Sequence, residues 1–182
     1  MAPSRSRIPG LIGIVWVAFM ATPAGVDAAT ATVSNSLNAN IGALGGVSVP
    51  GTATLTKSGT VFSSFTGTVA VQYRVRTSVS GGGAMTLSVT QDFQTGGPSV
   101  AAGDLTYSCG AASLGTACAN TTASTTSATS VVSLPSSSCT GGGSPCSASD
   151  PNTVTLTFTL ADRPTVKTGS YTATVQFTIS AT

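Results

Sequence analysis

The chain has 182 residues, of which 41% are hydrophobic and only 7% charged, and its formal net charge is +2. This balance leaves no basic stripe of the kind that nucleic acid or an anionic membrane surface attracts, so composition supports neither class of partner. Glu and His are absent, good helix formers are scarce, and Ser and Thr make up roughly a third of the residues. Thr and Val suit pleated strands, so we expect an all-β protein with a packed core.

Residues 1–28 are typical of a signal peptide. Arg5 and Arg7 supply a positive start, Leu11–Met20 form an apolar run, and small or tolerated residues precede the expected cleavage after Ala28. An uncleaved membrane anchor is the alternative, but the apolar run is short and lies close to Pro23. We therefore expect a mature chain of residues 29–182 that is one domain, without a stable membrane anchor, and secreted, periplasmic or at the cell surface.

The segment Ala29–Ala43 alternates between apolar and polar residues. Its apolar positions are Ala31, Val33, Leu37, Ala39 and Ile41, in phase across a polar Asn35. An alternating strand at a free terminus can add to the sheet edge of a neighbouring subunit, as in donor-strand complementation. Pairing within its own sandwich is the commoner use of such a strand. Both interpretations are open, and the first makes these five residues a candidate strand-exchange segment.

Period-two alternation predicts a series of short strands along the rest of the chain. In chain order they cover residues 52–58, 60–65, 69–79, 85–90, 104–109, 130–134, 153–160 and 171–181. Gly81–Gly83 is expected to join two of them as a hairpin, and the Ser/Thr-rich stretch Ala119–Ser130 is expected to be a long connection. About eight to ten strands with one polar and one apolar face each predict an immunoglobulin-like antiparallel β-sandwich.

Four cysteines lie in the middle of the chain, at Cys109, Cys118, Cys139 and Cys146. An even number in an exported protein predicts disulfides, for which three connectivities exist. We favour the two local pairings, Cys109 with Cys118 and Cys139 with Cys146, while the crossed and nested pairings remain open. Zinc is poorly supported, because there is no C-x-x-C spacing and no His to complete a site. No metal or cofactor is expected.

The sequence offers no recognisable catalytic residues. The mature chain has only four acids, Asp92, Asp104, Asp150 and Asp162, each beside a turn or a strand end. Asp at such places commonly hydrogen-bonds nearby backbone, whereas an enzyme would need a cleft that gathers at least two of them. Ser is abundant, but without His no general base is in evidence for a Ser nucleophile. We therefore expect a protein that is not an enzyme.

The aromatic residues are expected in the core rather than at a glycan. Tyr73, Phe158, Tyr171 and Phe177 all fall on the apolar phase of their strands, and Trp16 lies in the signal segment. Glycan-binding modules stack sugars on exposed aromatic faces, so this distribution gives a stacking site little support.

The closing segment Gly169–Ile179, with its Gly-x-Tyr-x-x-x-Val pattern, resembles the last strand of bacterial spore-coat-U and related pilin-like secreted domains. The mature start Ala29–Val33 also resembles theirs, although the Cys that usually follows the first strand is missing here. The resemblance implies an immunoglobulin-like sandwich in a surface or assembly protein. We expect a non-catalytic structural subunit whose partners are itself or other surface subunits. The alternative is a monomeric module that binds a glycan or protein through loops at one end.

Overall fold

The structure, a computed structural model, describes residues 36, 38–57, 59–78, 81–136, 138 and 151–182. Residues 40–182 form one compact unit, in which the described residues contain ten strands and no helix. The strands are β1 (Leu44–Ser48), β2 (Thr56–Lys57), β3 (Phe65–Arg76), β4 (Gly83–Gln91), β5 (Leu105–Cys109), β6 (Thr116–Ala117), β7 (Thr121–Thr122), β8 (Thr129–Leu134), β9 (Asn152–Leu160) and β10 (Thr174–Ala181). No described segment is a helix long and apolar enough to cross a membrane.

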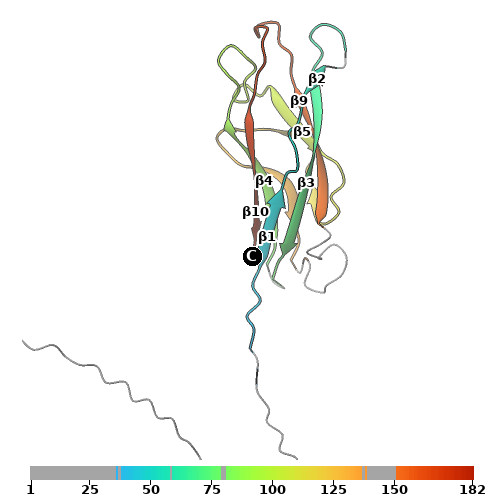
Figure 1. Ribbon diagram of the computed structural model, residues 1–182, viewed down its shortest axis with the longest axis vertical. Coiled ribbons are helices and arrows are strands. Elements are labelled where there is room, and N and C mark those ends of the chain that lie inside the picture. The colour runs from blue at the N-terminus through green and yellow to red at the C-terminus, as the bar shows by residue number, and fades with distance from the viewer. Residues whose placement is uncertain (1–35, 37, 58, 79–80, 137, 139–150) are drawn as a thin grey trace, which may run out of the picture. The chain divides into compact units, whose positions relative to one another are not determined.

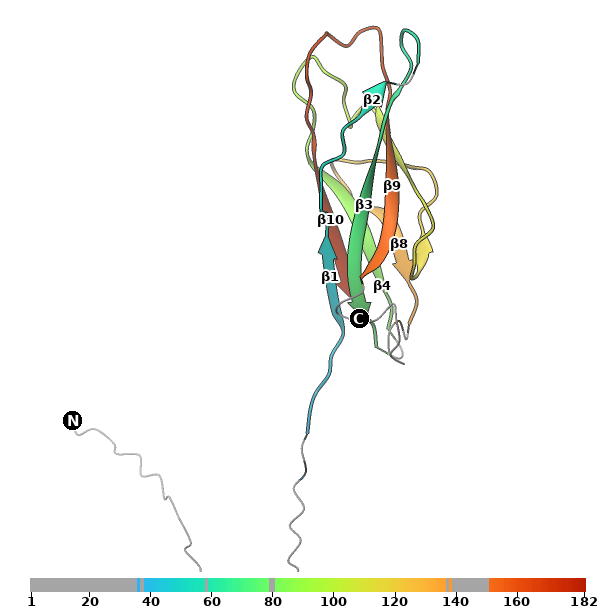
Figure 2. The ribbon, with the colours of Figure 1, turned by 45° about the vertical axis from the view of Figure 1, so that its right-hand side comes forward.

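The strands form two antiparallel sheets that pack face to face (Figures 1 and 2). The first sheet has the order β1-β3-β9-β5-β7, with β2 also paired to β3, and the second has the order β10-β4-β8-β6. Every strand pair is antiparallel. The predicted all-β sandwich is confirmed.

The core lies between the sheets and is built by the alternation seen in the sequence. In β9, Val154, Leu156 and Phe158 are buried, whereas Thr153 and Thr155, which alternate with them, are exposed. The inward row of β3, including Val71 and Tyr73, lies beside that of β9 in the same sheet. The inward row of β4, including Met85 and Leu87, faces both from the other sheet, and all four of these side chains are fully buried. Burying one such Leu or Val contributes about 1.5–3 kcal/mol, so these rows set the sandwich spacing.

The predicted hairpin at Gly81–Gly83 is wrong, because β3 and β4 lie in different sheets. These glycines instead allow a close approach to the end of β10. A Cβ on Gly81 would lie 2.1 Å from the Thr182 carbonyl oxygen, and one on Gly83 would lie 2.2 Å from the Ser180 carbonyl oxygen. The connection from β3 to β4 therefore crosses between the sheets. Gly81 and Gly83 are required there because a side chain would clash with the end of β10, and not because they form a hairpin turn.

Several strand boundaries also differ from the predicted ones. Only residues 56–57 of the predicted strand 52–58 pair, and residues 60–63 form a turn before β3 begins at Phe65. β7 lies inside the stretch expected to be a connection. β1 begins at Leu44, after the alternating N-terminal segment, and the described residues of that segment are in no strand. β10 begins at Thr174, three residues later than predicted.

One disulfide is present among the described residues, between Cys109 and Cys118, with a Cα–Cα distance of 5.2 Å. This confirms the first local pairing, whereas Cys139 and Cys146 lie outside the described residues. The loop it closes is tied to β3, because the Tyr73 hydroxyl donates to the Leu114 carbonyl oxygen. Burial raises the pKa of Tyr73 above its ordinary value, despite its hydrogen bonds. The Tyr73 hydroxyl therefore stays protonated and acts as a structural donor.

Replacing both Cys109 and Cys118 by Ala is expected to lower the free energy of unfolding by about 2–3 kcal/mol, because a short covalent loop in the unfolded chain is released. Urea titration under oxidising conditions measures this change. An unfolding midpoint equal to that of the unaltered protein would show that the bridge does not form in solution.

Candidate functional site

A groove lies between β1 and β10. It has a volume of about 420 Å³. Its lining comes from the end of β1, from β4 and from the first half of β10: Val47, Val49, Thr90, Thr174, Val175, Gln176 and Phe177. The lining is mainly apolar, and the groove runs along one edge of a sheet. An apolar groove beside a sheet edge is a surface to which an extended peptide can add as a strand.

The groove exists because β1 approaches β10 without pairing to it. β1 is hydrogen-bonded to β3, and it approaches β10 at Gly45, where an added Cβ would lie 3.1 Å from Cγ2 of Ile179. Further along, Val47 and Val49 lie opposite the beginning of β10 across the groove. The two strands therefore run in opposite directions, side by side, with Gly45 permitting contact at one end.

β10 has a strand partner on one edge only. It pairs with β4 over its whole length, and no described strand is hydrogen-bonded to its other edge. The order β1-β3-β9-β5 corresponds to strands A-B-E-D of an immunoglobulin-like sandwich, and β4 beside β10 corresponds to C beside F. The seventh strand, G, which would flank β10, has no counterpart among the described residues. Its place is the edge along which the groove lies.

The side chains of β10 alternate along this open edge. Val175, Phe177 and Ile179 are half-buried and pack against the core, whereas Gln176 and Thr178 are exposed. An open edge presents unpaired backbone N–H and C=O groups, and here it also presents a half-covered apolar row. The edge can therefore accept a further strand that has one apolar face.

Exposed apolar side chains gather on the chain leading into β1 and out of it. Ile41 is 70% exposed, Leu44 is 65% exposed and Val49 is 38% exposed. Of the predicted strand-exchange residues, Ala39 is also exposed, and Ala31, Val33 and Leu37 lie outside the described residues. Single exposed apolar residues are ordinary on a protein surface, but several on one short segment indicate an interaction site.

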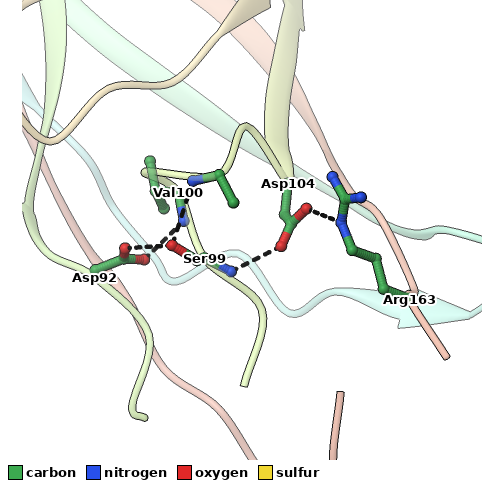
Figure 3. Close-up of polar contacts among 6 residues, drawn as sticks. Asp92, Ser99, Val100, Asp104 and Arg163 are labelled. Atoms are coloured by element: carbon green, nitrogen blue, oxygen red, sulfur yellow. Dashed lines mark hydrogen bonds and ion pairs between the residues drawn. The ribbon is translucent and has the colours of Figure 1, made fainter. Parts of the chain in front are cut away.

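A separate, polar feature lies in the loop between β4 and β5, where two of the four acids of the mature chain come near each other (Figure 3). The Asp92 carboxylate accepts hydrogen bonds from the amides of Phe93 at 2.7 Å, Val100 at 2.9 Å and Ala101 at 3.4 Å, and from the Ser99 hydroxyl at 3.2 Å. Burial acts to raise the pKa of Asp92, but these donors outweigh it and hold the pKa below its ordinary value.

Asp104 holds the other side of the same loop. Its carboxylate accepts a hydrogen bond from the Ser99 amide at 2.9 Å and pairs with the Arg163 guanidinium, and its side chain is 4% exposed. Ser99 thus lies between the two carboxylates (Figure 3). All four carboxylate oxygens face donors from the loop or from Arg163, and neither Asp lines the groove. This arrangement fixes the loop, as expected for Asp at turns.

The other two acids of the mature chain do not join this cluster among the described residues. Asp162 forms an ion pair with Lys57 at 2.5 Å, and Asp150 is outside the described residues. No group of three or more metal-ligating side chains occurs in the described part of the chain. A second hollow of about 380 Å³ is lined by Ser, Thr and small residues without an aromatic ring. It therefore lacks the stacking surface expected of a glycan site.

Tyr171 positions the start of β10 rather than filling the core as predicted. Its hydroxyl donates to the Lys167 carbonyl oxygen at 2.8 Å and lies 3.3 Å from that of Gly96, and an added Cβ on Gly97 would overlap the ring. A Tyr near the start of strand F that bonds back to backbone a few residues upstream is a tyrosine corner of immunoglobulin-like sandwiches. The sequence indicates this residue only through its Gly-x-Tyr spacing.

No family model, curated protein or solved structure matches this chain. The functional inference therefore rests on the geometry of the groove and on the open edge of β10. Sequence reasoning missed the groove residues Val47 and Val49, because short apolar runs beside Gly and Pro50 carry no clear alternation.

Replacing Asp92 with Asn is expected to lower the free energy of unfolding by about 1–3 kcal/mol at pH 7, because charge-assisted hydrogen bonds are lost. Because the pKa is lowered in the folded state, the carboxylate's contribution is complete above its ordinary value of 3.8 and is lost as the pH falls through the lowered pKa. Urea titrations from pH 7 to pH 2 should show that loss in the unaltered protein and not in the variant.

Asp162→Asn is the matched control, since it removes a partly exposed ion pair worth about 1 kcal/mol or less. Equal destabilisation by the two substitutions would contradict a special role for Asp92.

Proposed function

We propose that this protein is a non-catalytic structural subunit, secreted or held at the cell surface, that assembles by strand exchange. The N-terminal segment of one copy, with Ala31, Val33, Leu37, Ala39 and Ile41 on its apolar face, pairs with the open edge of β10 in the next copy. The observation that carries the proposal is that edge, unpaired and half-covered beside an apolar groove. The protein uses no cofactor, and its partners are further copies or other surface subunits.

The proposed donor segment matches the acceptor in length and pattern. Residues 31–41 would extend over roughly 35 Å as a strand, and the eight residues of β10 over roughly 26 Å, so the segment is longer than the strand it would pair with. Period-two alternation directs one apolar face into the groove and leaves Asn38 and Asn40 outside. Backbone hydrogen bonds between the segment and β10 would supply affinity, and the apolar contacts in the groove would fix the register of the segment against β10.

The start of the sandwich favours exchange between copies over pairing within one chain. Arg76 Nε donates to the Gly42 carbonyl oxygen at 3.0 Å, beside the pair formed by Leu44 and Arg76. Residues 40–43 are exposed and lead into β1 without being in a strand themselves. Gly45 and Ile179 are in contact at the same end, where a chain folding straight back from Gly42 into the groove would have to pass.

Two observations support the proposed localisation outside the cytoplasm. The Cys109–Cys118 disulfide is of a kind that persists in oxidising compartments, and residues 1–28 have the pattern of a signal peptide. The resemblance of the terminal segments to spore-coat-U and pilin-like domains points to the same compartment and role.

The second candidate function is a monomeric module that binds a glycan or a protein through loops at one end of the sandwich. It is favoured by Val61 and Phe62, which are 76% and 54% exposed in the loop between β2 and β3. This candidate requires a monomer in solution, so assembly separates the two.

Charged substitutions on the two sides of the proposed contact test it with matched controls. Leu37→Asp alters the donor and Asn38→Asp its opposite face. Val49→Asp alters the groove and Ser48→Asp its exposed neighbour. Leu37→Asp and Val49→Asp are each expected to give monomers in analytical ultracentrifugation, because a buried unpaired carboxylate is costly. The controls Asn38→Asp and Ser48→Asp should assemble as the unaltered protein does.

Mixing the two defective variants provides a positive signal. The Leu37→Asp chain keeps an intact groove and the Val49→Asp chain keeps an intact donor segment, so together they should form a 1:1 complex and nothing larger. Assembly of either variant on its own to the extent of the unaltered protein, or no complex in the mixture, would contradict strand exchange.

A further inference from the structure

The loop between β2 and β3 ends in an apolar tip formed by Val61 and Phe62. A turn closes there, with the Ser63 amide donating to the Thr60 carbonyl oxygen at 3.2 Å and the Ser63 hydroxyl to the same oxygen at 2.9 Å. Phe62 has a φ of 59°, a conformation that a bulky side chain rarely adopts and that turns usually give to Gly or Asn. The turn thus holds an exposed aromatic residue in a backbone conformation that such a residue disfavours. This indicates that Phe62 serves a function other than stabilising its own sandwich.

The tip and the start of β1 lie at opposite ends of the sandwich. β3 begins at Phe65, next to the tip, and ends at Arg76, which pairs with Leu44 at the start of β1. The 12 residues of β3 separate these ends by roughly 35 Å. Figures 1 and 2 show the loop before β3 at one end and the start of β1 toward the other. We call the end that carries Ile41 and Leu44 the base.

The direction of a donor strand decides which ends meet. Because Gly45 lies against Ile179 near the base, β10 runs from the tip end toward the base. A donor strand antiparallel to β10 would finish at the tip end of the acceptor copy. Only Gly42 and Ala43 then separate it from β1 of its own sandwich, a span of at most about 10 Å. The base of the donor copy must therefore abut the tip of the acceptor copy.

This stacking would bury every large apolar side chain that is strongly exposed in the described part of the chain. Those residues are Val49 at the groove, Ile41 and Leu44 at the base, and Val61 and Phe62 at the tip. A parallel donor would instead bring two bases together and leave both tips in water. All strand pairs within the sandwich are antiparallel, and antiparallel pairing is slightly the more stable.

We propose that Val61 and Phe62 form a second contact between successive copies, in which the tip of one sandwich packs against Ile41 and Leu44 at the base of the next. The inference rests on the proposed strand exchange and adds the orientation: the polymer is head-to-tail. The occupant of the tip is a second copy of this chain. The strained turn then has a role, because it holds Phe62 outward for a neighbour rather than for its own core.

A chain that carries both Leu44→Cys and Phe62→Cys tests this contact by disulfide formation in the full mature protein. The two positions are too far apart to bond within one sandwich, so any bond between them joins two copies. A non-reducing gel is expected to show a ladder of linked multimers. Each single substitution can give at most dimers, and Leu44→Cys with Thr68→Cys, at an exposed position midway along β3, should give no ladder.

The outcomes separate the two proposals. No ladder from a protein that still assembles overturns the tip contact and leaves strand exchange standing, whereas an unaltered protein that stays monomeric overturns both. Efficient dimers from Leu44→Cys alone indicate base-to-base pairing and also overturn the head-to-tail arrangement.

Phe62→Gly provides an independent readout. It relieves the positive-φ strain, so the thermal midpoint of the monomer should not fall, whereas the concentration for half-assembly should rise at least about tenfold through lost burial of the ring. An unchanged assembly midpoint in a folded variant overturns the contact.

Discussion

The open edge of β10 is the constraint on which the rest of this structure depends. A sheet edge with free backbone groups tends to pair with another chain, and natural proteins usually protect such edges with Lys, Pro, bulges or very short strands. Two of the other sheet ends follow that rule, because β6 and β7 have two residues each, whereas β1 at the remaining end has five. β10 has eight residues, with uncharged Thr, Gln and Ser at its outward positions. Apart from a register shift between Thr174 and Val175, β10 has none of these protections, and this supports the proposed strand exchange.

The polar clusters of the molecule serve to hold that edge in place. Tyr171 anchors the chain just before β10 to the loop after β4, and Thr172 donates to the Gln94 side chain at 3.0 Å in the same region. Asp92 and Asp104 fix the neighbouring loop through backbone amides and Ser99. Their oxygens are occupied by structural donors, so the acids contribute rigidity at the end where a donor strand would finish. A rigid edge reduces the entropy lost when a partner strand binds.

Alternation predicted the elements that have one buried face. The period-two pattern correctly places β4, β5, β8, β9 and most of β10. A strand that covers a core on one face needs an apolar side chain at every second position, so its pattern can be read from the sequence. The pairing of Cys109 with Cys118 was also predicted from spacing. Cys109 ends β5, and a separation of nine residues is enough for the chain to bring Cys118 back beside it.

Features that depend on contacts between distant parts of the chain could not be predicted from the sequence. Gly81–Gly83 has the composition of a hairpin tip, but its conformation is set by the backbone of Ser180 and Thr182, which are about a hundred residues away. Tyr171 fits the apolar phase of a strand, yet its hydroxyl satisfies loop carbonyl groups. The groove joins Val47 and Val49 to Val175 and Phe177, and no local pattern links segments so distant in the chain. The proposed donor segment is visible in the sequence as alternation, whereas the groove proposed to accept it is not.

The most direct test of the account is the solution mass of the oxidised mature chain, measured by light scattering beside a version that lacks residues 29–43. The account predicts oligomers that disappear on truncation while the remaining sandwich keeps its β-sheet circular dichroism and cooperative unfolding. A monomeric mature chain whose truncated form fails to fold would contradict it, because the segment would then be a strand of its own sandwich and the edge of β10 would already be filled.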